Sequence, residues 1–167
     1  MRQRKPIESL TIWGEEYVLE YRPSGREAVM IIPEAKKIEV NSGQHRPETE
    51  TVTALVQKRL MIRAKEIITT ETGRLAGERN IKYGHIRVKN TRSRFGSCSG
   101  DDNLNFNWQI ILFPIEKARH VILHELAHVM VKNHSREFWQ LLAKWDWQWR
   151  ENRWWLRHEA TRLMVFS

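Results

Sequence analysis

The sequence predicts an α+β fold, in which strands and helices occupy separate stretches of the chain. Residues 9–40 contain short apolar and alternating runs that are typical of strands, whereas residues 47–77 repeat apolar positions every three or four residues, as an amphipathic helix does. A helical pattern returns after Pro114 and covers most of the remaining chain. Together these observations favour a small twisted sheet accompanied by more helix than strand.

Length and composition are those of one soluble domain: 167 residues, of which 41% are hydrophobic and 29% are charged. We expect a single domain over residues 1–167, with a β-rich section at about 7–41 and a core at about 47–167. The lone cysteine, Cys98, excludes an intramolecular disulfide. No apolar run has the length of a signal peptide or a membrane span, so we expect a cytoplasmic protein with no membrane partner.

The β-rich section contains three candidate strands, at residues 10–13, 17–19 and 28–32, which are separated by Gly14 and by the turn Pro23-Ser24-Gly25. The helix that follows is expected to begin near Pro47 and to end near Gly73 or Gly77. Its apolar side chains fall on one face. They are Val52, Leu55, Val56, Leu60, Ala64, Ile67 and Ile68.

Residues 81–113 return to short strands broken by glycines, and residues 103–108 alternate strictly between asparagine and apolar side chains. In a strand, successive side chains point to opposite faces. Leu104, Phe106 and Trp108 are therefore predicted to face a core, and Asn103, Asn105 and Asn107 are predicted to face outward.

The helix predicted from Pro114 to about Lys132 carries His124-Glu125-Leu126-Ala127-His128. Side chains four residues apart lie one above the other on a helix, so both imidazoles can bind one metal ion. Glu125 lies at the edge of that face, where it can hold a water molecule. Because zinc lowers the pKa of its bound water to about 7, a neighbouring carboxylate can accept the proton during attack on a carbonyl.

A catalytic zinc ion needs three protein ligands and one open position, and His134 is the economical third ligand. It lies six residues past His128, so the chain must bend. We predict that Asn133 adopts the left-handed backbone that ends a helix and that Ser135 caps the next one. The cofactor predicted is one Zn²⁺ per chain, bound by His124, His128 and His134.

Structural histidines on an amphipathic helix are the plain alternative to a metal site. Apolar residues surround the three polar ones on nearly every side, however, which indicates a buried helix. Two histidines and a glutamate buried without a partner would be costly, whereas a metal ion satisfies them.

Four motifs together resemble the YgjP-like metallopeptidases, a branch of the zincin superfamily related to the SprT and Wss-type proteases. They span about residues 90–140. The motifs are Arg94-Phe95-Gly96-Ser97-Cys98-Ser99, Asn103-Leu104-Asn105-Phe106-Asn107-Trp108, His124-Glu125-Leu126-Ala127-His128 and Asn133-His134-Ser135-Arg136-Glu137-Phe138-Trp139. Phe95 stands where the family more often has tryptophan.

The resemblance implies a compact zincin-like metallopeptidase with a three-histidine site and Glu125 as general base. Such an enzyme would hydrolyse peptide bonds in a peptide or protein substrate. The strand at residues 103–108, with Asn103, Asn105 and Asn107, is a candidate edge to which an extended substrate adds as a further strand. An ordinary half-buried strand is the alternative.

Two residues near the site have open roles. Glu137 could orient a ligand imidazole through the free ring nitrogen, or it could stabilise the first turn of its own helix. His120 lies one turn before His124 and could border the cleft, although a plain structural or exposed histidine is the favoured interpretation.

A nucleic-acid-binding protein, or a DNA-associated protease whose zinc is regulated or structural, is the rival hypothesis. The net charge is +8, and a tryptophan-rich helix is predicted from Trp145 onward. The densest basic block contains Lys82, Arg87, Lys89, Arg92 and Arg94. A solvated basic surface is the favoured interpretation of that block, and tryptophans more often pack than stack on bases.

Overall fold

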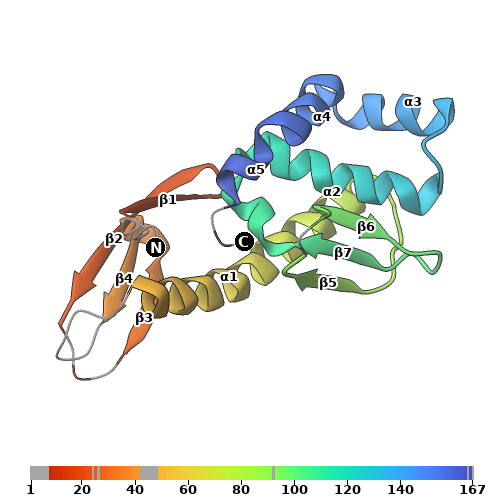
Figure 1. Ribbon diagram of the computed structural model, residues 1–167. Coiled ribbons are helices and arrows are strands. Elements are labelled where there is room, and N and C mark those ends of the chain that lie inside the picture. Colours follow the sequence, from red (N-terminus) through yellow and green to blue (C-terminus); the bar gives the residue numbers. More distant parts are fainter. Residues whose placement is uncertain are drawn as a thin grey trace.

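The computed structural model describes residues 8–23, 25, 27–41, 49–91, 93–164 and 166. These residues form a four-stranded sheet, a three-stranded sheet and five α-helices, so the predicted α+β class is confirmed. The four-stranded sheet lies at one end of the molecule, and the three-stranded sheet and most of the helices lie at the other (Figure 1).

The N-terminal sheet has the strand order β1-β2-β4-β3. Its strands are β1 (Ser9–Ile12), β2 (Glu15–Arg22), β3 (Ala28–Ile32) and β4 (Lys37–Asn41). The first three correspond to the predicted strands, whereas β4 follows a short 3₁₀ helix, η1 (Pro33–Ala35), that the sequence pattern does not reveal. β4 pairs parallel with β2 and antiparallel with β3, and it supplies the fully buried Ile38 and Val40.

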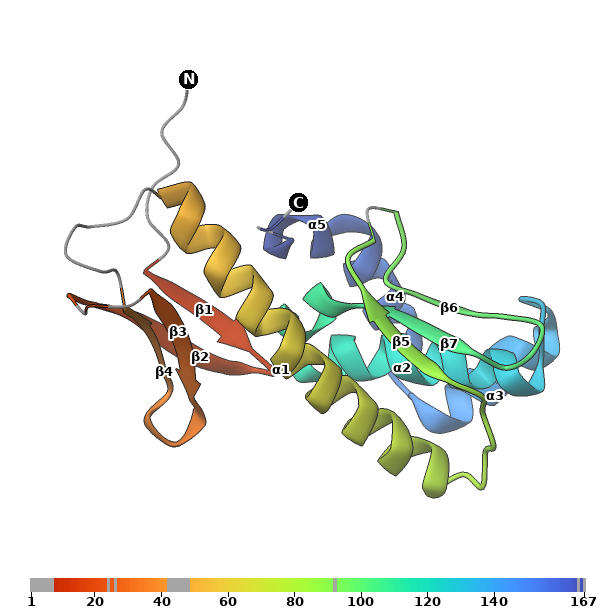
Figure 2. The same ribbon diagram turned by 90° about the horizontal axis from the view of Figure 1, so that it is seen from below.

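Helix α1 (Thr49–Gly77) joins the two ends of the molecule. Figure 2 shows its first half beside the N-terminal sheet and its second half approaching β5. The predicted apolar face is buried through Val52, Val56, Leu60, Ala64 and Ile68. The predicted start at Pro47 lies outside the described residues, as does Ser24 of the predicted turn.

The second sheet has the order β5-β7-β6, formed by β5 (Ile86–Lys89), β6 (Gly96–Cys98) and β7 (Leu104–Asn107). β7 pairs parallel with β5 and antiparallel with β6. The prediction that Asn103, Asn105 and Asn107 lie on an edge strand open to a substrate is therefore wrong, because the backbone of β7 already bonds a neighbour on each side.

Asn107 also corrects the predicted outward orientation, since it is only 1% exposed. Its Oδ1 accepts a hydrogen bond from the amide of Gln109 at 3.0 Å and caps the 3₁₀ helix η2 (Trp108–Leu112), while its Nδ2 donates to the carbonyl of Thr91 at 2.7 Å. Asn103 and Asn105 are half-buried. Leu104, Phe106 and Trp108 are buried as predicted.

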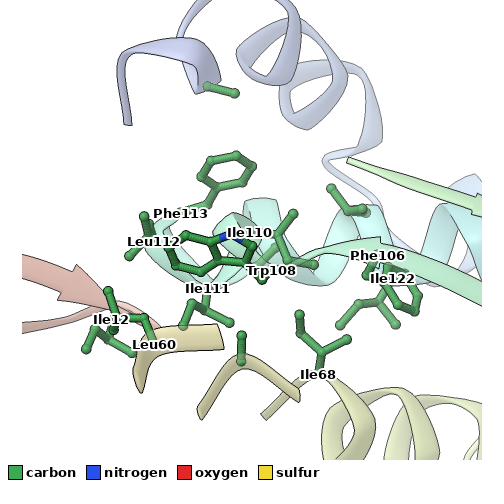
Figure 3. Packing of buried hydrophobic residues seen from close by; sticks show 14 of the residues in the cluster. Ile12, Leu60, Ile68, Phe106, Trp108, Ile110, Ile111, Leu112, Phe113 and Ile122 are labelled. Carbon is green, nitrogen blue, oxygen red and sulfur yellow. The ribbon is translucent and has the colours of Figure 1, made fainter. Parts of the chain in front are cut away.

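The main core surrounds η2, in which all five residues are buried. Figure 3 shows Trp108, Ile110 and Ile111 between side chains of α1, such as Leu60 and Ile68, and Ile122 of the following helix. The sheet and the helix that carries the predicted site therefore share one apolar layer.

Four helices complete the chain. They are α2 (Ile115–Met130), α3 (Arg136–Trp145), α4 (Trp149–His158) and α5 (Ala160–Leu163). Their positions match the predicted helices after Pro114, near Ser135 and in the tryptophan-rich tail. Among the described residues, no helix is both long enough and apolar enough to cross a membrane.

Candidate metal centre

Helix α2 and the connection to α3 bring the three predicted histidines together. His124 and His128 project from one face of α2, and His134 lies just before α3. The Nε2 atom of His134 is 3.0 Å from that of His124 and 3.1 Å from that of His128. One ring nitrogen from each histidine lies within 4.8 Å of one ring nitrogen from each of the other two, so the three can bind a single ion.

The bend before His134 differs from the one predicted. Asn133 is not among the described residues with a left-handed backbone; instead, α2 ends at Met130 and its C-cap residue, Val131, is extended. The Oδ1 of Asn133 accepts a hydrogen bond from the amide of Ser135 at 3.2 Å. Ser135 caps α3 as predicted, because its Oγ accepts from the amide of Phe138 at 3.4 Å. Side-chain hydrogen bonds therefore shape this turn.

A backbone contact orients one of the imidazoles. His128 Nδ1 lies 3.1 Å from the carbonyl oxygen of Val131, which can only accept, so Nδ1 carries the proton. The Nε2 lone pair is then free to bind a metal, in the arrangement that metal-binding histidines usually adopt.

Phe138 and Trp139 complete the walls of the centre, and sequence reasoning assigned them no role. Phe138 is fully buried, and its ring centroid lies 4.9, 4.5 and 4.8 Å from those of His124, His128 and His134. Trp139 stacks on His134 at 5.4 Å and donates from Nε1 to the carbonyl of His134 at 3.1 Å. The sequence did offer a signal, because the aromatic pair Phe138-Trp139 follows within one turn of the cap residue Ser135.

The surroundings keep the three imidazoles neutral. Burial is the main cause, and it lowers the pKa of His124 to about 3, with further contributions from the neighbouring rings and Arg153. Burial also lowers the pKa of His128 and of His134. Because only the neutral ring can bind a metal ion, these shifts favour metal binding at neutral pH.

Glu125 is 6% exposed and lies against strand β6. A Cβ atom added at Gly96 would lie only 2.7 Å from Cγ and from Oε1 of Glu125, so only glycine leaves room for this carboxylate. Burial raises the pKa of Glu125 to about 8, and the positive charge of Arg94 opposes the rise. The result is a buried carboxyl group, next to His124 in the chain, whose pKa lies well above its usual range.

His120 is a structural residue rather than a part of this cluster. It is 2% exposed, and its Nδ1 lies 2.5 Å from Oδ2 of Asp146. Asn152 donates to the same carboxylate and accepts from Lys117 at 2.8 Å. This network joins α2 to α4 and makes His120 a buried structural histidine, which is one of the two interpretations favoured from the sequence.

Glu137 is exposed in the first turn of α3. Among the described residues, no hydrogen bond joins its carboxylate to any of the three imidazoles. Stabilisation of the α3 terminus therefore accounts for its position, and a role in orienting a ligand stays a prediction.

Lys132 ties the connection between α2 and α3 to the turn after β6. Its Nζ donates to the carbonyl of Ser99 at 3.1 Å and pairs with Asp102. The loop that carries His134 is thereby held against the same sheet that contacts Glu125.

Comparisons with known proteins identify one family and one similar solved structure. The family model described as the YgjP-like metallopeptidase domain matches residues 1–159. Among solved structures, the chain is similar to the metallopeptidase zymogen of Methanocaldococcus jannaschii jannalysin, with 23% identity, a TM-score of 0.49, and coverage of 55% of this chain and 95% of that chain. No curated protein matches the chain.

Proposed function

Since the chain belongs to the YgjP-like metallopeptidase family, we propose that it is a zinc-dependent peptidase whose metal is bound by His124, His128 and His134. The observation that carries this proposal is the convergence of three imidazole nitrogens within 4.8 Å beside a buried glutamate. The family supports a metal-dependent peptidase in general, and the proposal adds that the metal is zinc and that Glu125 is the base.

The donor set fits zinc. Three neutral imidazoles are a common ligand set for catalytic zinc, and they leave the fourth tetrahedral position open. A structural zinc site would usually be closed by a fourth protein ligand, often a cysteine. Within the described part of the chain, the group that can bind a metal contains only these three histidines.

When bound, zinc would lower the pKa of a water molecule and polarise the substrate carbonyl. Glu125 accepts the proton of the attacking water and later delivers it to the leaving amine. Without metal, burial raises the pKa of Glu125 to about 8, and a nearby divalent cation would lower that pKa and favour the ionised form that accepts the proton. Gly96 keeps the carboxylate in position.

Strand β6 is the edge that an extended substrate can reach. The amide of Asn107 donates to the carbonyl of Phe95, and Ser97 pairs opposite Asn105, so the backbone groups of Phe95 and Ser97 point toward β7. In an antiparallel ladder the alternate residues point the other way. Gly96 and Cys98 therefore offer their amide and carbonyl groups to a substrate strand beside Glu125.

A nucleic-acid partner is the second candidate. Lys82, Arg87, Lys89 and Arg94 are exposed, whereas Arg92 lies outside the described residues. Trp147 and Trp154 are 84% and 55% exposed. Binding to single-stranded DNA that weakens steeply with salt would support this partner and would leave the peptidase proposal intact.

The test of the proposed function is Glu125→Gln. The amide preserves the size of the side chain but cannot accept a proton, so turnover of an unfolded protein such as β-casein should fall by about a hundred- to ten-thousand-fold. Zinc content and the unfolding transition of the same sample should match those of the wild type.

Full turnover with zinc retained would refute Glu125 as the base. Loss of zinc together with turnover would instead make Glu125 a ligand or a structural partner. A wild-type protein that binds no zinc would refute the metal assignment itself.

A further inference from the structure

Arg153 of α4 is half-buried. Among the described residues, no carboxylate lies within ion-pair distance of its guanidinium. The acids on and beside α4 pair elsewhere. These pairs are Asp146 with His120, Glu151 with Lys117, and Glu159 with Arg162.

Trp139 links this cation to the metal ligands. The guanidinium carbon of Arg153 lies 4.8 Å from the centroid of the Trp139 ring. The same ring stacks on His134 at 5.4 Å and an interplanar angle of 24°, and it lies 6.1 Å from the ring of His124. A second stacked ring, Trp149, lies 4.8 Å from Trp139. The ring of Trp139 therefore connects Arg153 to the histidine cluster.

Glu125 and Arg153 are associated with elements that pack on different sides of α2. Glu125 contacts β6, and Arg94 is the cation that acts on its pKa. Arg153 belongs to α4, which packs on the side of α2 away from β6 (Figure 1), and its guanidinium lies over the ring of Trp139. Charge is thus available on the side of the centre that Glu125 does not occupy.

Amide hydrolysis is faster when such a group faces the substrate carbonyl. Attack by water forms a C–O bond and moves the carbonyl π electrons onto the oxygen, which becomes negative, while the proton of the water passes to Glu125. A fixed donor aimed at that oxygen stabilises the transition state. A guanidinium is always charged and presents five N–H donors in a rigid plane.

We infer that Arg153 donates a hydrogen bond to the carbonyl oxygen of the scissile bond as that oxygen becomes an oxyanion. The inference rests on the proposed peptidase function. Arg153 neither gains nor loses a proton. The electron pair returns from the oxygen when the C–N bond breaks, and the amine leaves with the proton held by Glu125. Trp139 is the positioning residue for Arg153.

The experiment uses Arg153→Met and a matched control, Arg150→Met, on the zinc-loaded full chain. Arg150 lies on the same helix and covers an aromatic ring in the same way, 4.5 Å from the centroid of Trp149, but it does not contact the aromatic ring that stacks on the metal ligands. The probes are a peptide containing the β-casein site that the wild type cleaves fastest, and a phosphinic peptide of the same sequence that mimics the tetrahedral oxyanion. Calorimetry gives the dissociation constants of the two peptides. The cleavable peptide is measured on variants that also carry Glu125→Gln, so that it is not hydrolysed during the titration.

Arg153→Met should weaken the phosphinic peptide by about a hundred- to a thousandfold and lower kcat by a similar factor. Binding of the cleavable peptide, KM and zinc content should stay near the wild-type values, and Arg150→Met should change none of them. The wild type is measured first, so failure of the proposed function appears as missing zinc or missing cleavage in that sample.

Three results would overturn the inference. If Arg153→Met weakens binding of both peptides equally, Arg153 binds the substrate before reaction. If the variant loses zinc, Arg153 supports His134. If neither binding nor kcat changes, Arg153 has no role in the reaction. If Arg153→Met does not fold, Arg153→Lys replaces it. That variant retains the charge without the planar fork, and undiminished preference for the phosphinic peptide would then argue against an oxyanion contact.

Discussion

The two ends of the molecule differ in how they treat polar groups. The N-terminal sheet keeps the ion pairs Lys36–Glu15 and Lys37–Glu20 near the surface, pairs the buried Glu39 with the exposed Arg22, and rests on α1 through apolar side chains. The metal end buries Glu125, His120 and Asn152, each in contact with specific neighbours. Buried polar groups depend on their partners far more than exposed ion pairs do, so substitutions should have different consequences at the two ends.

The largest effect is expected at a metal ligand. His128→Ala removes one of three nitrogen donors and should abolish most zinc binding and turnover, since a site with two ligands is incomplete. Metal analysis of the purified variant measures this directly. His85→Ala, which removes an exposed imidazole outside the cluster, is the control. Equal zinc content in wild type and His128→Ala would remove His128 from the ligand set.

A substitution in the core of the N-terminal sheet should lower stability without changing catalysis. Ile38 is fully buried in β4, and Ile38→Ala should lower the free energy of unfolding by about 2–5 kcal/mol. Zinc content and turnover per folded molecule should stay unchanged.

Val18→Ala, in the same sheet but 50% exposed, should cost about 0.5 kcal/mol or less in chemical denaturation. If Ile38→Ala lowers turnover per folded molecule, the two ends are coupled through α1 and the contrast between them fails.

Gly96→Ala introduces a methyl group where Glu125 already lies. The clash should displace the carboxylate, cost about 1–3 kcal/mol of stability and lower turnover by about a hundredfold, while zinc is retained. Nothing lies within 4 Å of a Cβ atom at Gly100, so Gly100→Ala is the matched control. Unchanged turnover in Gly96→Ala would mean that the position of Glu125 is not critical.

The smallest effect is expected at an exposed ion pair. Lys37→Met should leave the denaturation midpoint within the spread of repeated measurements, because solvent screens the Lys37–Glu20 pair. The hydrogen bond from Lys37 holds the pKa of Glu20 below its usual range. A lowered carboxyl pKa stabilises the fold at neutral pH, and that contribution is lost in acid. Any difference between wild type and variant should therefore vanish at low pH, and a difference that grows in acid would contradict this assignment.

Several elements could be predicted because their signals are local. His124 and His128 share a face because four residues make about one turn of a helix, and Ser135 caps α3 because its hydroxyl reaches an amide three residues ahead. The apolar face of α1 follows from its own spacing in the same way. None of these inferences requires knowledge of a distant part of the chain.

The wrong predictions concern residues 103–108, whose surroundings depend on which other segments pair with them. The alternation of residues 103–108 reveals a strand with one buried face, but it contains no information on which strands bond its two edges. β5 and β6 occupy both edges of β7. Asn107 turned inward in part for the same reason, because its Nδ2 donates to Thr91 in another segment; its bond with the amide of Gln109 is a local cap, made because the strand ends there and η2 begins.

By itself, the sequence determined the helices, the apolar faces and the spacing that makes His124, His128 and His134 candidate ligands of one ion. Only the tertiary structure decided what surrounds them: Gly96 against Glu125, Phe138 beneath the three rings, and Arg153 above Trp139. The physical reason is the range of the interactions. Helical periodicity and capping act within about one turn, whereas burial, pKa shifts and stacking depend on segments that meet only when the chain is folded.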